Sequence, residues 1–231
     1  MPPAQSQKLN NMSAPERLAR LQAELATAMQ ACARPAEALT LIAVSKTFSA
    51  PAIRPVLEAG HLDFGENRIQ EALDKWPALK EEFPQARLHL IGALQSNKAA
   101  QAVEHFDAIH SLDRLKLAAK LADAVQKLGR QPTLFVQVNT GNEPQKSGIS
   151  LDDLDGFVEA CTRDYELTIT GLMCLPPAHD VPAPHFALLE KRAHNLGLTA
   201  LSMGMSGDYL SALPFGATHI RLGTAIFGPR G

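Results

Sequence analysis

Lys46 is the residue of this sequence with the clearest chemical potential. It comes two positions after an apolar run, residues 39–44, whose composition predicts a buried strand. A lysine that leaves an apolar wall is desolvated, which lowers the pKa of its amine and favours the neutral form that condenses with a carbonyl to a Schiff base. A lysine at a strand end can equally extend its amine into solvent, so position alone leaves both interpretations open.

Two glycine-bearing segments near the C-terminus have the composition of a phosphate-binding site. They are residues 203–207, MGMSG, and the pair Gly223-Thr224. Glycines allow backbone N–H groups to approach an anion, and Ser206 and Thr224 add hydroxyl donors. The same glycines would also suit tight turns between strands and helices, so this pattern too has two interpretations.

Arg221 lies inside an apolar run, residues 219–222, two positions before Gly223. A guanidinium group in such a run is unfavourable unless it meets an anion or another acceptor. An amine, a phosphate-binding loop and a partner for a ring nitrogen are together what pyridoxal 5'-phosphate requires. The sequence therefore predicts this cofactor, provided that the fold brings the three segments together.

Short apolar segments alternate with helical patterns along most of the chain, which predicts parallel βαβ units. The predicted strands are residues 39–44, 62–65, 87–91, 108–110, 133–138, 168–172, 200–203 and 219–222. The predicted helices are residues 15–33, 51–59, 67–83, 97–105, 113–128, 151–162, 184–196 and 208–213. Eight such strands fit a (β/α)8 TIM barrel, whose usual size is about 250 residues.

The barrel places the candidate residues together, because its functional groups gather at the carboxyl ends of the strands and its first and last strands are neighbours. An open, doubly wound sheet is the alternative fold. Only nine residues, 223–231, follow the last strand, so the extra N-terminal helix is expected to cover the place of an eighth helix. Residues 1–12 are expected to be a flexible tail and residues 13–231 a single domain.

Composition excludes several classes of protein. The chain has 231 residues and a net charge of −2, and 45% of its residues are hydrophobic, as in ordinary globular proteins. It shows no basic excess for nucleic acid and no apolar run long enough to cross a membrane. Three scattered cysteines and a polar N-terminus favour a reduced, cytoplasmic location.

A metal site is not expected. The eight histidines form no His-x-x-x-His pair, and the cysteines form no Cys-x-x-Cys pair. His89 and His110 are better explained as hydrogen-bonded strand residues than as ligands. Cys174 is better explained as a packed thiol than as a nucleophile.

Six ordered motifs resemble the pyridoxal phosphate homeostasis protein family. They are LIAVSKT (41–47), FGENRIQEALDK (64–75), LHLIGALQSNK (88–98), VNTGNEPQKSGI (138–149), TGLMCLPP (170–177) and LSMGMSGDY (201–209) followed by THIRLGTAIFGPR (218–230). The resemblance spans residues 14–230 and implies a barrel of the alanine racemase N-terminal type. It also implies a role in intracellular vitamin B6 homeostasis, in which the protein carries or buffers the cofactor without established catalysis.

The resemblance assigns a role to individual residues. Lys46 would hold the cofactor as a Schiff base, and Arg221 would face the pyridine nitrogen. The remaining cofactor-binding residues implied are Asn67 beside the cofactor, and Ser206, Gly223 and Thr224 at its phosphate. Lys146 matches a family lysine associated with secondary contact to the cofactor, although a solvated loop charge is an equal interpretation. Cofactor-free enzymes are candidate acceptors of the cofactor. A monomer is expected because the sequence shows no unusual exposed apolar stripe.

An amino-acid racemase of low activity is the alternative function. Racemisation needs a second base opposite the lysine, commonly a tyrosine, and the chain has only Tyr165 and Tyr209. Tyr165 precedes a predicted strand, at the wrong end of a barrel, and Tyr209 lies beside the phosphate-binding loop. An arginine at the ring nitrogen also disfavours a protonated pyridine, which weakens the electron sink that a racemase needs. The sequence therefore favours binding without catalysis.

Overall fold

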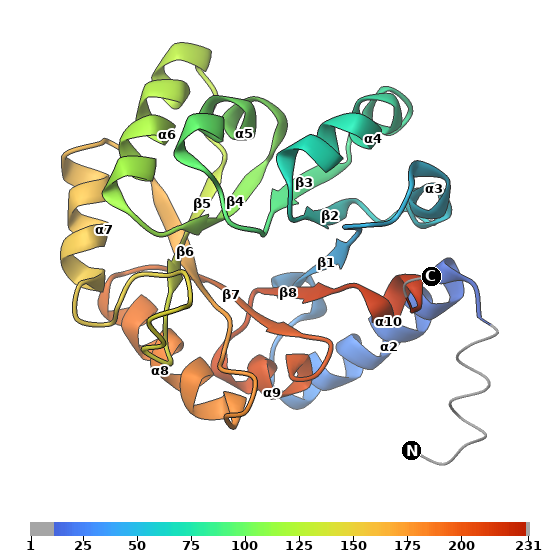
Figure 1. Cartoon of the computed structure of the whole chain (residues 1–231). Coiled ribbons are helices and arrows are strands. Elements are labelled where there is room, and N and C mark those ends of the chain that lie inside the picture. The colour runs from blue at the N-terminus through green and yellow to red at the C-terminus, as the bar shows by residue number, and fades with distance from the viewer. Residues whose placement is uncertain (1–11, 230–231) are drawn as a thin grey trace.

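The computed structural model describes residues 12–229, and its centre is a closed barrel of parallel strands (Figure 1). The strands follow one another around the barrel in chain order, and β8 pairs with β1 through Arg221 beside Ile42. The predicted barrel is thus confirmed, and the alternative open sheet is wrong. The predicted N-terminal tail lies outside the described residues except for Met12.

The strands lie close to their predicted positions. They are β1 (Thr40–Val44), β2 (Asp63–Glu66), β3 (Arg87–Leu90), β4 (Ala108–Leu112), β5 (Thr133–Val138), β6 (Ile169–Cys174), β7 (Ala200–Met205) and β8 (His219–Leu222). The connecting helices are α3 (Ala50–Glu58), α4 (Ile69–Glu82), α5 (Ala99–His105), α6 (Leu115–Leu128), α7 (Leu154–Arg163) and α8 (Pro182–Asn195). Shorter turns of helix are α9 (Tyr209–Ala212) and α10 (Thr224–Phe227), and 3-10 turns are η1 (Ala36–Ala38), η2 (Ser96–Lys98) and η3 (Leu213–Phe215).

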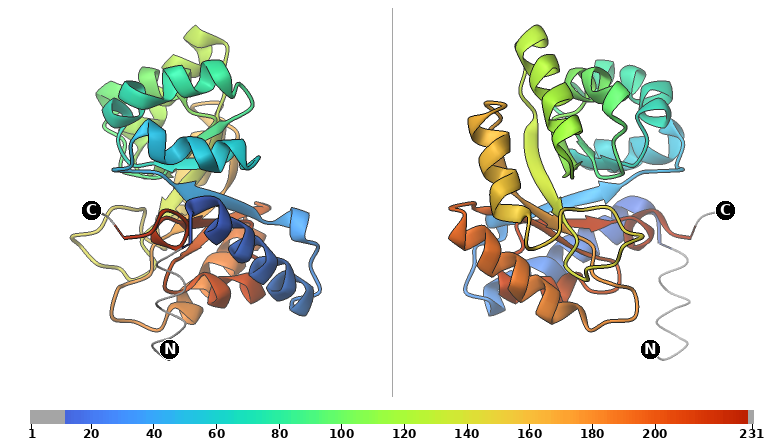
Figure 2. Two further views of the ribbon diagram at one scale, coloured as in Figure 1. Left: turned by 90° about the vertical axis from the view of Figure 1, so that its right-hand side faces the viewer. Right: turned by 60° about the vertical axis from the view of Figure 1, so that its left-hand side comes forward.

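Helix α2 (Ala14–Ala31) precedes the first strand and packs beside α10, as Figures 1 and 2 show. It begins with a capping box in which the Ser13 side chain accepts from the Glu16 backbone and Glu16 accepts from the Ser13 backbone. The Arg17 Nε donates to the Ile226 carbonyl at 2.7 Å. Helix α2 therefore covers the position next to β8, as expected from the short C-terminal segment.

The main apolar core lies between the barrel and its helices. The buried face of α2 belongs to it, with Leu18, Leu21, Leu25 and Met29 at helical spacing. Inside the barrel the apolar cluster is small and consists of Phe135, Met173 and Ala200. Polar side chains occupy much of the remaining barrel interior, which is unusual for this fold.

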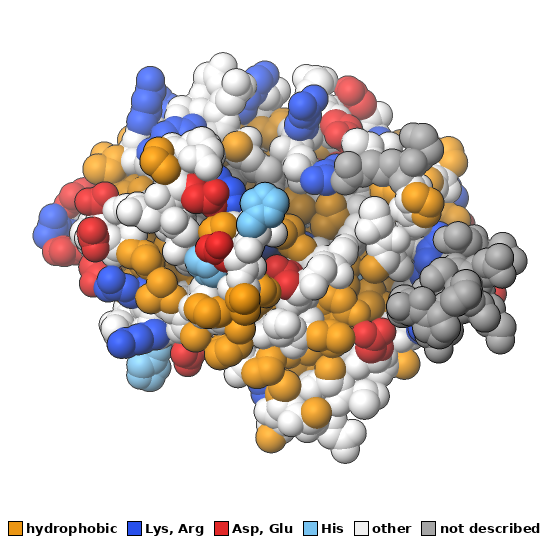
Figure 3. Space-filling view, turned by 60° about the horizontal axis from the view of Figure 1, so that its bottom comes forward, with side chains coloured by type: hydrophobic (Ala, Val, Ile, Leu, Met, Phe, Trp, Pro, Cys, Tyr) orange, Lys and Arg blue, Asp and Glu red, His pale blue; other side chains and the backbone are white. Residues whose placement is uncertain are grey.

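The molecular surface carries charges of both signs. On the face seen in Figure 3, Lys and Arg side chains lie mostly along the upper and left edges, Asp and Glu are scattered, and apolar side chains gather in the lower centre. Within residues 12–229, no helix combines the length and the apolar character needed to traverse a bilayer.

Candidate functional site

A pocket of about 240 Å³ opens at the carboxyl ends of β1, β2, β7 and β8. All six residues predicted to contact a cofactor line it: Lys46, Asn67, Ser206, Arg221, Gly223 and Thr224. The remaining lining residues are apolar: Val44, Ile91, Leu175 and Met205. The structure therefore brings together residues up to 178 positions apart in sequence, as the barrel prediction requires.

The segment that carries Lys46 is held by hydrogen bonds on both sides. The Ser45 Oγ lies 2.5 Å from the Glu66 Oε1, and the Lys75 Nζ donates to the carbonyls of Ser45 at 2.9 Å and Phe48 at 3.0 Å. Thr47 adopts φ 69°, in the left-handed region that non-glycine residues rarely enter. Such a backbone persists only where its surroundings fix it, so Lys46 projects from a rigid turn.

A buried ion pair lies behind this turn, and sequence reasoning missed it. The Glu66 side chain is fully buried, and its Oε1 lies 2.9 Å from the Lys75 Nζ and 2.9 Å from the Trp76 Nε1. Glu71 adds a second carboxylate to Lys75 at 2.9 Å. The signal was present in the motif FGENRIQEALDK, where an acidic residue at a strand end precedes a helix with a lysine nine positions later.

Arg221 is 4% exposed, and backbone and side-chain acceptors hold its guanidinium. Its Nη1 donates to the Ser202 carbonyl at 2.8 Å and to the Ser202 Oγ at 2.5 Å, and its Nη2 donates to the Cys174 carbonyl at 2.9 Å. Burial lowers the pKa of Arg221 to about 10, so the group remains a cation near neutral pH. The pocket thus contains a fixed positive charge on the strand beside the one that precedes Lys46.

Backbone geometry shapes the two segments predicted to bind phosphate. Gly204, near the end of β7, has φ +95°, and a Cβ there would lie 3.0 Å from the Tyr209 Cα, so this strand end requires glycine. The Asp208 Oδ1 accepts from the Met205 N–H at 2.6 Å and closes that turn. A Cβ on Gly223 would approach the Val44 carbonyl to 3.3 Å, which keeps β8 close to β1 at the pocket.

Asn67 lines the pocket from the loop before α4, because this helix begins at Ile69 and not at residue 67. The sequence predicts a helix from residue 67, but Arg68 is extended with φ −131° and ψ 130°, and the helix begins at Ile69. A Cβ on Gly92 would lie 2.2 Å from the Asn67 carbonyl oxygen, so this glycine allows the next loop to pass directly over Asn67.

A second pocket of about 530 Å³ adjoins the first and shares Asn67 with it. The loop after β5 lines it, including Lys146. The Lys146 Nζ pairs with the Glu143 carboxylate at 2.6 Å, and the lysine side chain is 34% exposed. The structure therefore places Lys146 beside the predicted site but outside its first pocket.

The two tyrosines do not line the pocket that contains Lys46. The Tyr209 hydroxyl donates to the Glu24 carboxylate on α2 at 2.7 Å, and burial together with this contact raises the pKa of Tyr209 to about 12. Tyr165 lines a different pocket beside α6. Burial also raises the pKa of Cys174 to about 12, so its thiol stays protonated.

The buried histidines have hydrogen-bond partners, as predicted for His89 and His110. The His89 Nδ1 lies 3.1 Å from the His110 Nε2, and the His110 Nδ1 lies 2.8 Å from the Ser202 Oγ. Among residues 12–229, no group of three or more His, Cys, Asp or Glu side chains has the geometry to hold a metal ion.

Comparison with known proteins finds a matching family model and relatives that carry the same name. Residues 17–231 match the family model of the alanine racemase N-terminal domain. A pyridoxal phosphate homeostasis protein of Pseudomonas aeruginosa is 43% identical over 93% of this chain and 95% of its own length. One of Escherichia coli is 38% identical over 92% and 95%.

Solved structures of one further protein, PipY of Synechococcus elongatus, are similar over nearly the whole chain. The structure without PLP is 40% identical, with a TM-score of 0.84 over 94% of this chain and 100% of PipY. The structure with PLP bound is 41% identical, with a TM-score of 0.79 over 93% and 100%.

Proposed function

The chain belongs to the family of pyridoxal phosphate homeostasis proteins, which shares the fold of the alanine racemase N-terminal domain, and we propose that it binds pyridoxal 5'-phosphate as a carrier or buffer. One observation carries this proposal. The six residues predicted from sequence to contact the cofactor come from four strand ends and line a single pocket.

The chemistry of the pocket fits the cofactor group by group. Lys46 supplies the amine for the aldehyde, and Arg221 supplies a donor for the pyridine nitrogen. The hydroxyls of Ser206 and Thr224, with the backbone at Gly223, supply donors for the phosphate. The apolar side chains that line the same pocket suit the flat faces of the ring.

Attachment to Lys46 requires no reagent beyond the cofactor and the protein. Lys46 would hold the cofactor through its amine, which would join the aldehyde carbon with loss of one water. The rigid turn around Ser45 and Thr47 places the amine without a large loss of conformational freedom, which favours retention of the cofactor. When bound, the cofactor would supply this carbon for exchange between amines.

Two features of the site support a carrier rather than a racemase. The Tyr209 hydroxyl is engaged by Glu24, and Tyr165 lies at another pocket, so neither is placed opposite Lys46 as a second base. The permanent cation of Arg221 disfavours a protonated ring nitrogen, which racemases use as an electron sink. Relatives named for homeostasis are consistent with this role.

The direct experiment is covalent trapping. The purified protein is mixed with one equivalent of PLP, reduced with borohydride and examined by intact-mass spectrometry and peptide mapping. We expect a single adduct on Lys46. Lys46→Ala is expected to lose both the adduct and the long-wavelength absorption band of the bound cofactor, while its thermal unfolding stays cooperative.

Lys120→Ala is the matched control, since Lys120 is an exposed helix lysine paired with Asp123. It is expected to behave as the unchanged protein. A stoichiometric adduct on another lysine, with Lys46 unmodified, would overturn the assignment.

Release of the cofactor from loaded protein to a cofactor-free enzyme tests the carrier role. If the loaded protein does not transfer its cofactor, the protein stores the cofactor but does not deliver it. Sedimentation tests the proposed monomer, and cell fractionation tests the proposed cytoplasmic location.

A further inference from the structure

The interior of the barrel below Arg221 contains a column of buried polar side chains. Ser202 and His110 are fully buried, His89 is 5% exposed and Asp63 is 8% exposed. Among the described residues, the smaller apolar cluster consists of Phe135, Met173 and Ala200. Burial of so many polar groups is unfavourable unless each is hydrogen-bonded, so their arrangement needs a physical account.

The polar groups form an unbroken series of hydrogen bonds. The Arg221 Nη1 lies 2.5 Å from the Ser202 Oγ, which lies 2.8 Å from the His110 Nδ1. The His110 Nε2 lies 3.1 Å from the His89 Nδ1. The His89 Nε2 in turn lies 3.0 Å from the Asp63 Oδ1. The series joins β8, β7, β4, β3 and β2 across the barrel.

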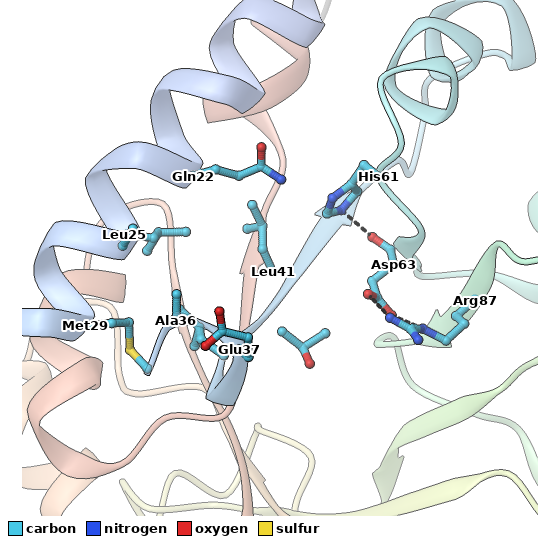
Figure 4. A pocket seen from close by; sticks show the side chains of 12 residues that line it. Gln22, Leu25, Met29, Ala36, Glu37, Leu41, His61, Asp63 and Arg87 are labelled. Atoms are coloured by element: carbon cyan, nitrogen blue, oxygen red, sulfur yellow. Dashed lines mark hydrogen bonds and ion pairs between the residues drawn. The ribbon is translucent and has the colours of Figure 1, made fainter. Parts of the chain in front are cut away.

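The outer end of the series is a carboxylate at the opposite end of the barrel from Lys46. Asp63 pairs with Arg87 through two hydrogen bonds, at 2.7 and 2.6 Å, and the Arg87 side chain is 57% exposed. Figure 4 shows this pair beside His61 in a pocket of about 370 Å³ that α2 borders. Burial alone would raise the pKa of Asp63, but the hydrogen bonds from His89 and Arg87 outweigh it and hold the pKa well below its usual range.

The two ends fix the direction of the outermost bonds of the series. Ionised Asp63 can only accept, so the His89 Nε2 carries a hydrogen. Arg221 can only donate, so Ser202 accepts from it, and the hydrogen of the Ser202 hydroxyl is then available to the His110 Nδ1. Burial, and then the neighbouring His89, His219 and Arg221, hold the pKa of His110 well below its ordinary value. When the Ser202 hydroxyl donates to the His110 Nδ1, the single hydrogen of neutral His110 is on Nε2 and donates to the His89 Nδ1.

Other groups surround the series without entering it. The His110 ring stacks on Phe135, with centroids 4.3 Å apart. The His219 ring lies 5.9 Å from the His110 ring and 6.2 Å from the His89 ring, while its Nδ1 contacts the Thr218 hydroxyl at 2.8 Å. The His61 Nε2 contacts the backbone carbonyl of Asp63 at 2.9 Å. Among residues 12–229, a single series of side-chain hydrogen bonds thus connects Asp63 to Arg221.

We propose that Asp63, His89, His110 and Ser202 form a hydrogen-bonded chain of fixed polarity, the Arg221 relay, that positions the Arg221 guanidinium toward the pocket that contains Lys46. The proposal rests on the proposed function, since Arg221 is there the donor to the ring nitrogen of PLP. The members of the relay are positioning residues and do not line that pocket. Asp63 sets the tautomers of the histidines, which orient the Ser202 hydroxyl so that a lone pair faces Arg221.

The first test concerns the tautomers and needs no cofactor. Nitrogen-15 NMR of the histidine side chains in the cofactor-free protein is expected to show a hydrogen on Nε2 and a bare Nδ1 for both His89 and His110. A hydrogen on the Nδ1 of either ring would overturn the fixed polarity. This result is independent of trapping on Lys46, so the two proposals fail separately.

The second test uses the PLP-loaded protein and the pH profile of its long-wavelength absorption. Ser202→Ala removes one acceptor from Arg221. It is expected to shift the midpoint of that profile by about half a pH unit or more, and to speed release of the cofactor about threefold or more. Asp63→Asn, which is remote from the pocket that contains Lys46, is expected to shift the midpoint in the same direction by a smaller amount.

Ser111→Ala is the matched control, because Ser111 is a buried serine on β4 whose hydroxyl has no hydrogen-bond partner among the described residues. It is expected to leave both the profile and the release rate unchanged. All variants should still be trapped by borohydride on Lys46. An effect of Ser202→Ala without any effect of Asp63→Asn would reduce the relay to a local contact and contradict the proposal, and so would an equal effect of Ser111→Ala.

Discussion

Buried histidines make the free energy of unfolding of this protein depend on pH, and part of this dependence can be assigned to a single residue, His219. Burial, and then the neighbouring His89, lower the pKa of His219 to about 4. Asp63 raises that pKa by a smaller amount, while Arg221 and Arg87 lower it. His219 is therefore neutral in the folded state at pH 5, where a histidine in the unfolded chain is protonated, because its pKa there is about 6.5.

The sign of the pH effect follows from this difference. Above about pH 6.5 the residue is neutral in both states and contributes nothing. Between pH 6.5 and 4 the unfolded chain gains a proton that the folded protein does not, so the free energy of unfolding falls as the pH falls. The loss for His219 approaches roughly 3 kcal/mol by pH 4.

We expect urea unfolding of the cofactor-free protein to show a steady fall in the free energy of unfolding from pH 7 to pH 4.5. His219→Asn removes one titrating group, so its stability should change less over the same range. Asp63 does not affect the comparison, since it is present in both proteins and its lowered pKa keeps its contribution nearly constant above about pH 5. Parallel slopes for the two proteins would contradict the assignment to His219.

At the scale of elements, the turn between β1 and α3 depends on helix α4. The Lys75 side chain is 9% exposed and its amine contacts the carbonyls of Ser45 and Phe48 and the carboxylate of Glu66. Removal of one partner from a buried ion pair leaves the other charge uncompensated, which costs about 3–5 kcal/mol. Helix α4 thus contributes to the site through a residue that does not line the pocket.

Lys75→Met is therefore expected to lower the free energy of unfolding by about 3 kcal/mol or more and to weaken PLP binding, because the turn that holds Lys46 loses its anchor. Urea unfolding and equilibrium dialysis measure the two effects. Lys80→Met on the same helix is the control, since Lys80 pairs with a partly exposed Asp107 and should cost less than about 1 kcal/mol. Unchanged PLP affinity in folded Lys75→Met would show that the turn is rigid without α4.

The sequence predicted elements well where local pattern decides them. Strands β5 and β8 begin and end where apolar runs do. Strand β4 continues past its predicted end to Leu112, because its pairing with β5 resumes at Val136 after an irregularity. The late start of α4 follows from the extended Arg68, which no local pattern indicates. Register with a neighbour and close approach of loops decide such boundaries.

The residues of the candidate site could be predicted from the sequence because the fold, once assigned, brings them together. In a barrel, every strand end meets the same mouth, so residues that follow strands can be paired without knowledge of distances. The supporting contacts were not predictable, because His110 and Ser202 are 92 positions apart and meet only through the register of the barrel. The Glu66–Lys75 pair likewise depends on how α4 lies against β2.

At the scale of the whole molecule, the two ends of the described chain pack against each other on the outside of the barrel. Helix α2 lies beside α10, and the Arg34 guanidinium donates to the carbonyls of Leu213 and Ala217 at 3.0 and 2.9 Å. The helix buries Leu25 to 5% exposure. If closure makes the barrel one cooperative unit, damage to α2 must be felt on the far side of the barrel.

The single tryptophan allows a direct test, since Trp76 is buried on α4 and reports the region behind β2. Leu25→Ala is expected to lower the free energy of unfolding by about 2–5 kcal/mol. Because unfolding is cooperative, Trp76 fluorescence and far-ultraviolet circular dichroism should shift to the same lower urea concentration. Leu128→Ala, at a position that is 41% exposed, is the control and should change stability by less than about 0.5 kcal/mol. A fluorescence transition that stays in place while circular dichroism shifts would show that α2 unfolds separately and that the barrel does not depend on it.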